Sequence, residues 1–108
     1  AHPWHEARIR AKKARYAAEA VAPVMGEEVK KFAKALSGVT EVLGEHQDAW
    51  VAQQTLKELA SAPEIDGLSG FSLGLLHEFE FEQELFARNE FVELWPSVKQ
   101  AHKKARLA

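Results

Sequence analysis

The chain has 108 residues, of which 46% are hydrophobic and 28% are charged, a composition typical of one domain with a packed core. It contains no cysteine, which excludes disulfide bonds, thiolate metal sites and a cysteine nucleophile. No apolar run approaches the ~20 residues that span a bilayer, and no apolar segment follows the basic N-terminus as it would in a signal peptide. We therefore expect a cytoplasmic protein that is not embedded in a membrane.

The net charge of −2 conceals an uneven distribution of charged residues. Residues 1–15 contain five Lys or Arg and one acid, and residues 99–108 contain four Lys or Arg and no acid. The middle of the chain contains five Lys or Arg against fifteen acids. If the helices run up and down, the two basic ends can meet and form a local patch that binds anions despite the negative total.

Residues 3–22 predict a first helix. Pro3 suits the first turn of a helix, and the many alanines favour helix formation and close packing. Pro23 and Gly26 are expected to end this helix near Ala22.

Residues 27–61 predict one long helix, because apolar side chains recur at alternating spacings of three and four. Gly38 and Gly44 fall within it, where each costs up to about 1 kcal/mol relative to Ala, so we expect close approach of another backbone at both positions. His46 shares the apolar seam and is expected to be a hydrogen-bonded core residue rather than a ligand. The seam consists of Val29, Phe32, Leu36, Val39, Leu43, His46 and Trp50.

Residues 61–70 are rich in turn formers and predict a loop. A third helical segment is expected from Phe71, with Phe71, Leu75, Phe79 and Phe86 on one side. Phe79 and its near neighbour Phe81 are expected in the core rather than as a platform on which nucleic-acid bases stack.

Pro96 is expected to kink or divide this segment, and residues 99–106 predict a basic helix end. The fold class is therefore all-α. We expect residues 1–108 to form a single helical bundle, antiparallel and up-and-down, of three to four helices with one long helix near residues 27–61.

One face of the first predicted helix carries a regular series of polar side chains, which we call the basic ladder. At ~100° per residue, these side chains fall within an arc of about 100°. Each Arg or Lys offers charged donors to phosphate oxygens, and the helix fixes their spacing, so the ladder suits an extended polyanion. On an arbitrary helix, a solvated basic face would be the commoner explanation. The basic ladder consists of His5, Arg8, Lys12, Arg15 and Tyr16, and Glu19 follows on the same face.

Two motifs of the sequence resemble those of the CHAD domain, the conserved histidine α-helical domain. The resemblance is specific over residues 5–51 and weak over residues 71–98, where Gly74-Leu75 and the Phe91…Trp95 pair fit the last helices of the family more loosely. The two motifs are His5-x-x-Arg8-Ile9-x-x-Lys12-x-x-Arg15-Tyr16-x-x-Glu19 and Leu43-Gly44-Glu45-His46-Gln47-Asp48-Ala49-Trp50-Val51.

The resemblance implies an all-helical bundle that binds inorganic polyphosphate through basic surface residues, without known catalysis, and we expect neither a metal nor a cofactor. A CHAD domain usually has two helical halves, and this chain resembles the second half alone. The expected ligand is thus polyphosphate or another phosphate polyanion. The expected protein partner is either a missing N-terminal half or a second copy of the chain, in a homodimer that brings two basic ladders together. The binding residues implied are His5, Arg8, Lys12, Arg15 and Tyr16, with Lys13, Lys103 and Lys104 beside them and Glu19 and Asp48 as supporting residues.

Two other functions stay open on the residues alone. A protein–protein scaffold would use the basic ladder to contact acidic residues of another chain. A metal-dependent phosphohydrolase would need a carboxylate cluster, for which Glu41, Glu45 and Asp48 are candidates, but their arc lies opposite the apolar seam and is expected to be a solvated face. Lys57 and Arg88 lie off the ladder in acidic surroundings and are expected to matter little for anion binding.

Overall fold

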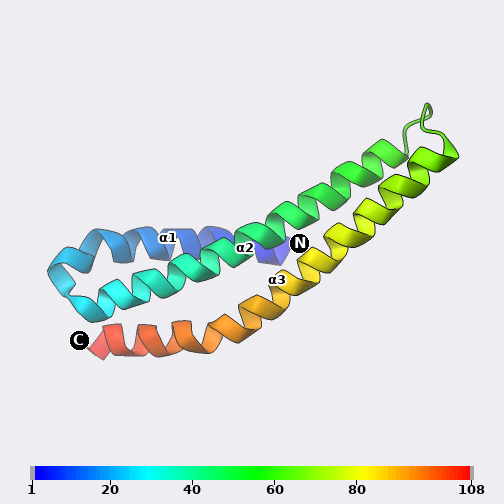
Figure 1. Cartoon of the computed structure of the whole chain (residues 1–108). Coiled ribbons are helices and arrows are strands. Elements are labelled where there is room, and N and C mark those ends of the chain that lie inside the picture. Colours follow the sequence, from blue (N-terminus) through cyan, green and yellow to red (C-terminus); the bar gives the residue numbers. More distant parts are fainter. Residues whose placement is uncertain (1, 108) are drawn as a thin grey trace.

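The computed structural model describes residues 2–107 and folds them into three α-helices with no strand among them. Helix α1 spans His2–Met25, α2 spans Glu27–Ala60 and α3 spans Gly67–Leu107. Consecutive helices run antiparallel, and both α1 and α3 pack against α2 (Figure 1). The predicted all-α antiparallel bundle is confirmed, with three helices. Within the described residues, no helix has a stretch long and apolar enough to cross a membrane.

The helix ends follow from local chemistry. Helix α1 continues past Ala22 to Met25, because Pro23 is exposed and water can satisfy the carbonyl that loses its amide donor. The chain turns instead at Gly26, whose φ of 98° favours glycine. Helix α3 begins before Phe71 because the Asp66 carboxylate accepts a hydrogen bond from the Ser69 amide at 2.7 Å and caps the helix. This bond also lowers the pKa of Asp66.

Pro96 does not divide the third helix. It lies inside α3, which stays one continuous helix to Leu107 and bends in its orange-to-red part in Figure 1. Such a bend is the usual response of a helix to a proline in its interior.

The core is built on one face of α2. Val39 and Leu43 are each 1% exposed, and Leu36 of α2 and Val98 of α3 complete their cluster. Burial of each such side chain contributes about 1.5–3 kcal/mol. The predicted apolar seam of α2 is therefore confirmed. A second cluster, at the α1–α2 turn, consists of Ala18, Val29 and Ala33.

The molecule is a rod. Its radius of gyration is 18.4 Å, compared with about 13 Å for a compact domain of this length. The cause is that α1 covers only part of α2: Trp4, at the start of α1, stacks on His46 in the middle of α2 with 4.7 Å between ring centroids. Residues 47–87 therefore project as two helices with their loop, which we call the distal hairpin (Figure 1).

The distal hairpin overturns the expectation that its phenylalanines are core residues. Phe79 and Phe81 are 55% and 39% exposed. The side of α3 that faces α2 here carries Glu84 and Ala87 instead, both buried. Periodicity predicted an apolar face on this helix, but it could not tell whether another element covers that face.

Candidate functional site

The basic ladder lies along the boundary between α1 and α2. One side of α1 packs on the core and carries Ala7, Ala11 and Ala18. The basic ladder is centred about a third of a turn from that side around the helix axis. Half-buried side chains have their stems fixed against the two helices, while their charged ends can still reach a ligand. The half-buried members are His5, Arg8, Lys12 and Arg15, whereas Tyr16 and Glu19 are exposed.

The Arg8 side chain lies against α2 at Gly44, where the helix backbone carries no side chain. A Cβ atom at Gly44 would lie 3.5 Å from Nε and 3.8 Å from one terminal nitrogen of Arg8. The buried Nε has no hydrogen-bond partner, so packing on the bare backbone positions this guanidinium. The backbone approach predicted at Gly44 is wrong, because only the Arg8 side chain comes within 4 Å of a Cβ there, at ordinary contact distances. The same expectation is wrong at Gly38, where a Cβ would meet nothing within 4 Å.

Arg15 is oriented by two neighbours on its own helix. Its Nε lies 3.5 Å from Oε1 of Glu19, one turn later, and its guanidinium carbon lies 4.8 Å from the centroid of the Tyr16 ring. An ion pair between neighbouring turns of one helix, with one partner exposed, contributes only a few tenths of a kcal/mol, so a phosphate group can replace the carboxylate at little cost.

Two lysines of α2 continue the ladder beyond Arg15. Lys30 and Lys34, one helical turn apart, line an open cavity of about 680 Å³ at the α1–α2 turn, together with Glu19 and Ser37. Neither lysine was predicted as a site residue, because both belong to the acidic middle of the sequence. The signal that could have found them is their i, i+4 spacing directly after the turn.

The remaining predicted site residues lie away from the ladder. Lys13 is exposed and points about 100° from Lys12 around the helix. Lys103 and Lys104 are exposed on α3, and no described Cα of α3 lies within 8 Å of one in α1. Asp48 is exposed on α2, and within residues 2–107 it forms no ion pair with the ladder. The structure thus does not gather these four residues onto the ladder surface.

The charges of the rod divide between its two ends. Residues 2–34 and 99–107, which include the ladder and the C-terminal tail, together carry a formal charge of +8. Ala105 of the tail packs on the cluster of Ala18, Val29 and Ala33 at the α1–α2 turn, whereas no described Cα of α3 lies within 8 Å of one in α1. Residues 35–98, the middle of the rod and the distal hairpin, carry −10.

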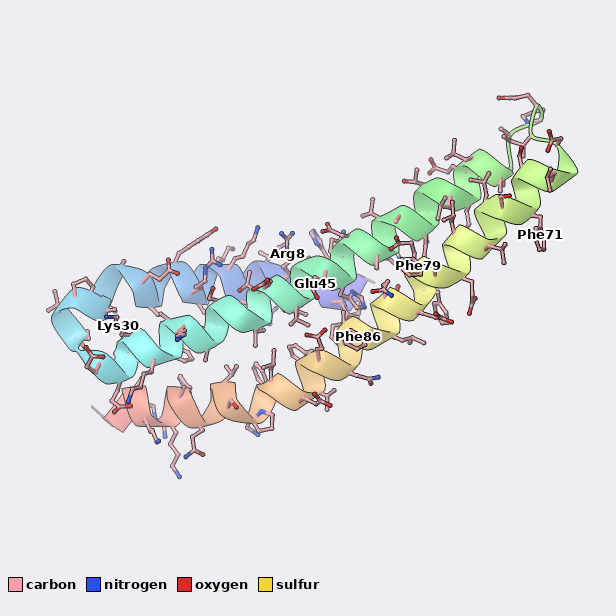
Figure 2. The ribbon with its side chains drawn as sticks, viewed as in Figure 1. Arg8, Lys30, Glu45, Phe71, Phe79 and Phe86 are labelled. Carbon is pink, nitrogen blue, oxygen red and sulfur yellow. The ribbon has the colours of Figure 1, made fainter. Side chains whose placement is uncertain are left out.

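The positive and negative parts of the rod meet where Arg8 lies against Gly44 of α2, and Glu45 follows Gly44 in the chain. Figure 2 labels both Arg8 and Glu45. Partial burial raises the pKa of Glu45, and repulsion from Glu90, Glu41 and Asp48 raises it further. Glu41, Glu45 and Asp48 are all exposed, as expected of a solvated face. Among residues 2–107, no three His, Asp or Glu side chains are grouped so that they could hold a metal ion.

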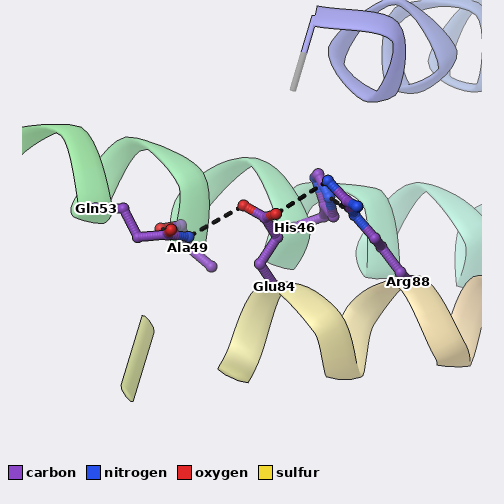
Figure 3. A network of polar contacts seen from close by, with 5 residues as sticks. All are labelled: His46, Ala49, Gln53, Glu84 and Arg88. Carbon is purple, nitrogen blue, oxygen red and sulfur yellow. Dashed lines mark hydrogen bonds and ion pairs between the residues drawn. The ribbon is translucent and has the colours of Figure 1, made fainter. Parts of the chain in front are cut away.

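A buried polar network crosses from α2 to α3 at the start of the distal hairpin (Figure 3). His46 is 1% exposed, and its Nε2 accepts a hydrogen bond from Nε of Arg88 at 3.0 Å. Arg88 also pairs with Glu84 at 3.0 Å, and the Gln53 amide donates to the other oxygen of Glu84 at 3.0 Å. The predicted core role of His46 is confirmed. Arg88 is a member of the core rather than an independent surface cation.

The fold and the site together define an all-helical protein with a row of cations along one helix boundary. The sequence model of the CHAD domain family matches residues 1–57, which is more than half of the chain and covers the whole ladder and the Arg8–Gly44 contact. The chain belongs to the CHAD domain family, a family associated with polyphosphate binding. No curated protein and no solved structure matches it.

Proposed function

We propose that the chain binds inorganic polyphosphate, or a similar phosphate polyanion, along the basic ladder and catalyses no reaction. The observation that carries this proposal is the seat of Arg8 on Gly44. Because packing holds the guanidinium in place before a ligand arrives, less side-chain freedom is lost when phosphate binds. Membership of the CHAD domain family supports the choice of ligand.

A phosphate chain on this surface contacts Arg8, Lys12 and Arg15 at successive helical turns, about 5.4 Å apart. Beyond Arg15 it reaches Lys30 and Lys34 in the cavity at the α1–α2 turn. His5 and Tyr16 add neutral or charged donors at the flanks of the row. Lys13, Lys103 and Lys104 attract the polyanion over a longer range without belonging to the same row.

Isothermal titration of the protein with long-chain polyphosphate at low ionic strength tests this proposal. The double variant Arg8→Ala and Lys12→Ala is expected to weaken binding by about tenfold or more, because two of the row's charged contacts are lost. Its helix content should stay near native, since Ala is a better helix former than either residue.

The matched control is the double variant Lys57→Ala and Arg106→Ala. It also removes one Lys and one Arg, both exposed and off the ladder, whereas Arg88 is unsuitable because it belongs to the core network. We expect the control to bind almost as well as the parent protein. Equal losses in the two double variants would show attraction by total charge and would contradict the site.

Two further double variants test which cations outside the basic ladder contact the phosphate chain. Lys30→Ala with Lys34→Ala is expected to weaken binding clearly, and Lys103→Ala with Lys104→Ala only slightly. The opposite order would move the binding surface from the α1–α2 boundary to α3.

A further inference from the structure

An apolar groove runs between α1 and α3 with α2 as its floor. It has a volume of about 390 Å³, and Leu36, Val39 and Leu43 form the floor. Ala11 and Trp95 stand on opposite walls, and the cations Arg10 and Lys99 lie at its edges. The groove opens on the side of α1 away from the basic ladder, because Arg10 and Ala14 lie roughly half a turn from Lys12. Its floor belongs to the middle of the rod, but the Lys and Arg side chains at its edges make its rim cationic.

A long apolar stripe lies at one end of the rod, on the distal hairpin. Its side chains follow helical spacings of three, four and seven, and they point roughly half a turn away from the side of α3 that faces α2. Their exposed fractions range from 55% to 78%. Figure 2 labels three of them along α3. The stripe consists of Leu68, Phe71, Leu75, Phe79 and Phe86.

The two surfaces carry opposite charge. Glu82 lies within the arc of the stripe and Glu78 beside it, and both are exposed. If the stripe of one copy packed on the stripe of another, these carboxylates would come together and repel, because residues 35–98 of each copy already carry a formal charge of −10. Packing of a stripe in a groove brings them to Arg10 and Lys99 instead.

We propose that two copies of the chain pair antiparallel, with the stripe of each distal hairpin seated in the α1–α3 groove of the other copy. The stripe and the groove lie at separate positions along one rod, so a single two-fold axis satisfies both contacts at once and closes the assembly. The basic ladder stays on the outer surface. This arrangement differs from a dimer in which two ladders face each other, and it does not depend on the proposed polyphosphate site.

The apolar area is sufficient for such a dimer. At roughly 200 Å² per large side chain, the exposed parts of the five stripe residues amount to about 600 Å² on each copy. The dimer covers two stripes and the two grooves that receive them, which reaches the range of about 1,200–2,000 Å² of a stable interface. An exposed patch of this size is also at the upper end of what a typical monomer presents to water.

Sedimentation and light scattering over a wide range of concentration test the assembly. The parent protein is expected to approach twice the monomer mass. Charge reversal at the groove, Arg10→Glu with Lys99→Glu, should raise the dissociation constant by about tenfold or more, and addition of Glu78→Lys with Glu82→Lys should restore pairing. The control Val24→Glu adds charge at a side chain that is 87% exposed outside both surfaces, and it should leave the mass unchanged.

Mixing two defective chains distinguishes this contact from other dimers. Phe71→Ser with Phe79→Ser impairs the stripe, and Ala14→Trp fills the groove from an exposed wall position. Each variant alone should be monomeric. An equimolar mixture should recover a weak dimer, because the intact stripe of one chain fits the intact groove of the other.

Three results would overturn the proposal. These are a parent protein that stays monomeric at high concentration, variants that remain dimeric, and a mixture of folded variants that recovers nothing. Titration with polyphosphate, which should be unaffected by the stripe variants, shows separately whether the ladder functions. A failed dimer and a failed binding site are therefore distinguishable.

Discussion

Nε of Arg88 donates a hydrogen bond to Nε2 of His46 across 3.0 Å, and this contact fixes the protonation state of the imidazole. A nitrogen that accepts a hydrogen bond cannot carry a proton, so His46 is neutral in the folded protein. Burial lowers the pKa of His46 below its ordinary value of 6.5; the Arg88 charge lowers it as well, and Glu84 opposes them. The core therefore requires a neutral histidine between α2 and α3.

The first prediction concerns pH and stability. Because the pKa of His46 is lower in the folded state, the unfolded chain binds more protons at pH values just below 6.5. The contribution of His46 to stability is thus complete above pH 6.5 and is lost as the pH falls below it. Urea unfolding at pH 7.5 and pH 5.5 should show lower stability at the acidic pH. His46→Gln should reduce that difference, and an unchanged difference would assign it to other groups.

The second prediction concerns the partner of His46. Arg88→Met removes a cation from Glu84, whose side chain is 6% exposed, and leaves that carboxylate with Gln53 alone. The expected cost is about 2–3 kcal/mol, less than for a fully buried pair because the Arg88 side chain is 37% exposed. The double variant with Glu84→Met removes both charges and should recover part of the loss. Chemical unfolding measures both effects, and a double variant less stable than Arg88→Met would disprove the role of the pair.

The third prediction separates two glycines of the same helix. Gly44→Ala and Gly38→Ala should each stabilise α2 by up to about 1 kcal/mol, since a Cβ at Gly44 makes only ordinary contact with Arg8. Gly44→Leu should displace the Arg8 guanidinium and weaken polyphosphate binding, whereas Gly38→Leu should not. Thermal unfolding and titration of the four variants test this, and equal affinities of the two Leu variants would remove Gly44 from the site.

The fourth prediction concerns the size of the anion. Long-chain polyphosphate should bind far more tightly than orthophosphate, because a single ion reaches only one or two cations of the ladder. The affinity should fall steeply with salt, and the slope against the logarithm of the salt concentration should decrease by about one for each contacting cation removed. Titrations at several salt concentrations test this. A slope that is the same for the parent and for Arg8→Ala would exclude direct contact by Arg8.

Local patterns predicted the helices and the seam of α2, because each depends on spacing within one segment. The ladder followed from one short motif, whereas the contact of the Arg8 side chain with Gly44 was not predicted. The Arg88–His46 bond could not be predicted, since its partners are 42 positions apart and neither residue type indicates the other. Lys30 and Lys34 were missed because the turn at Gly26 brings them beside α1. The exposed Phe79 shows the limit most clearly: a periodic apolar face does not specify what packs on it.

The rod is 61 Å long, and the segments that carry a formal charge of +8 lie toward one end while those that carry −10 extend to the other. This separation of charge gives the molecule a large electric dipole. In the field of a long polyanion such a rod rotates before contact, so that the end with α1 leads and the distal hairpin trails. Unpaired copies that collect on one strand of polyanion stand with their hairpins outward, and these anionic ends repel one another, which limits how densely the strand can be coated. In the antiparallel pair, by contrast, the two dipoles cancel, so only the unpaired chain is oriented in this way.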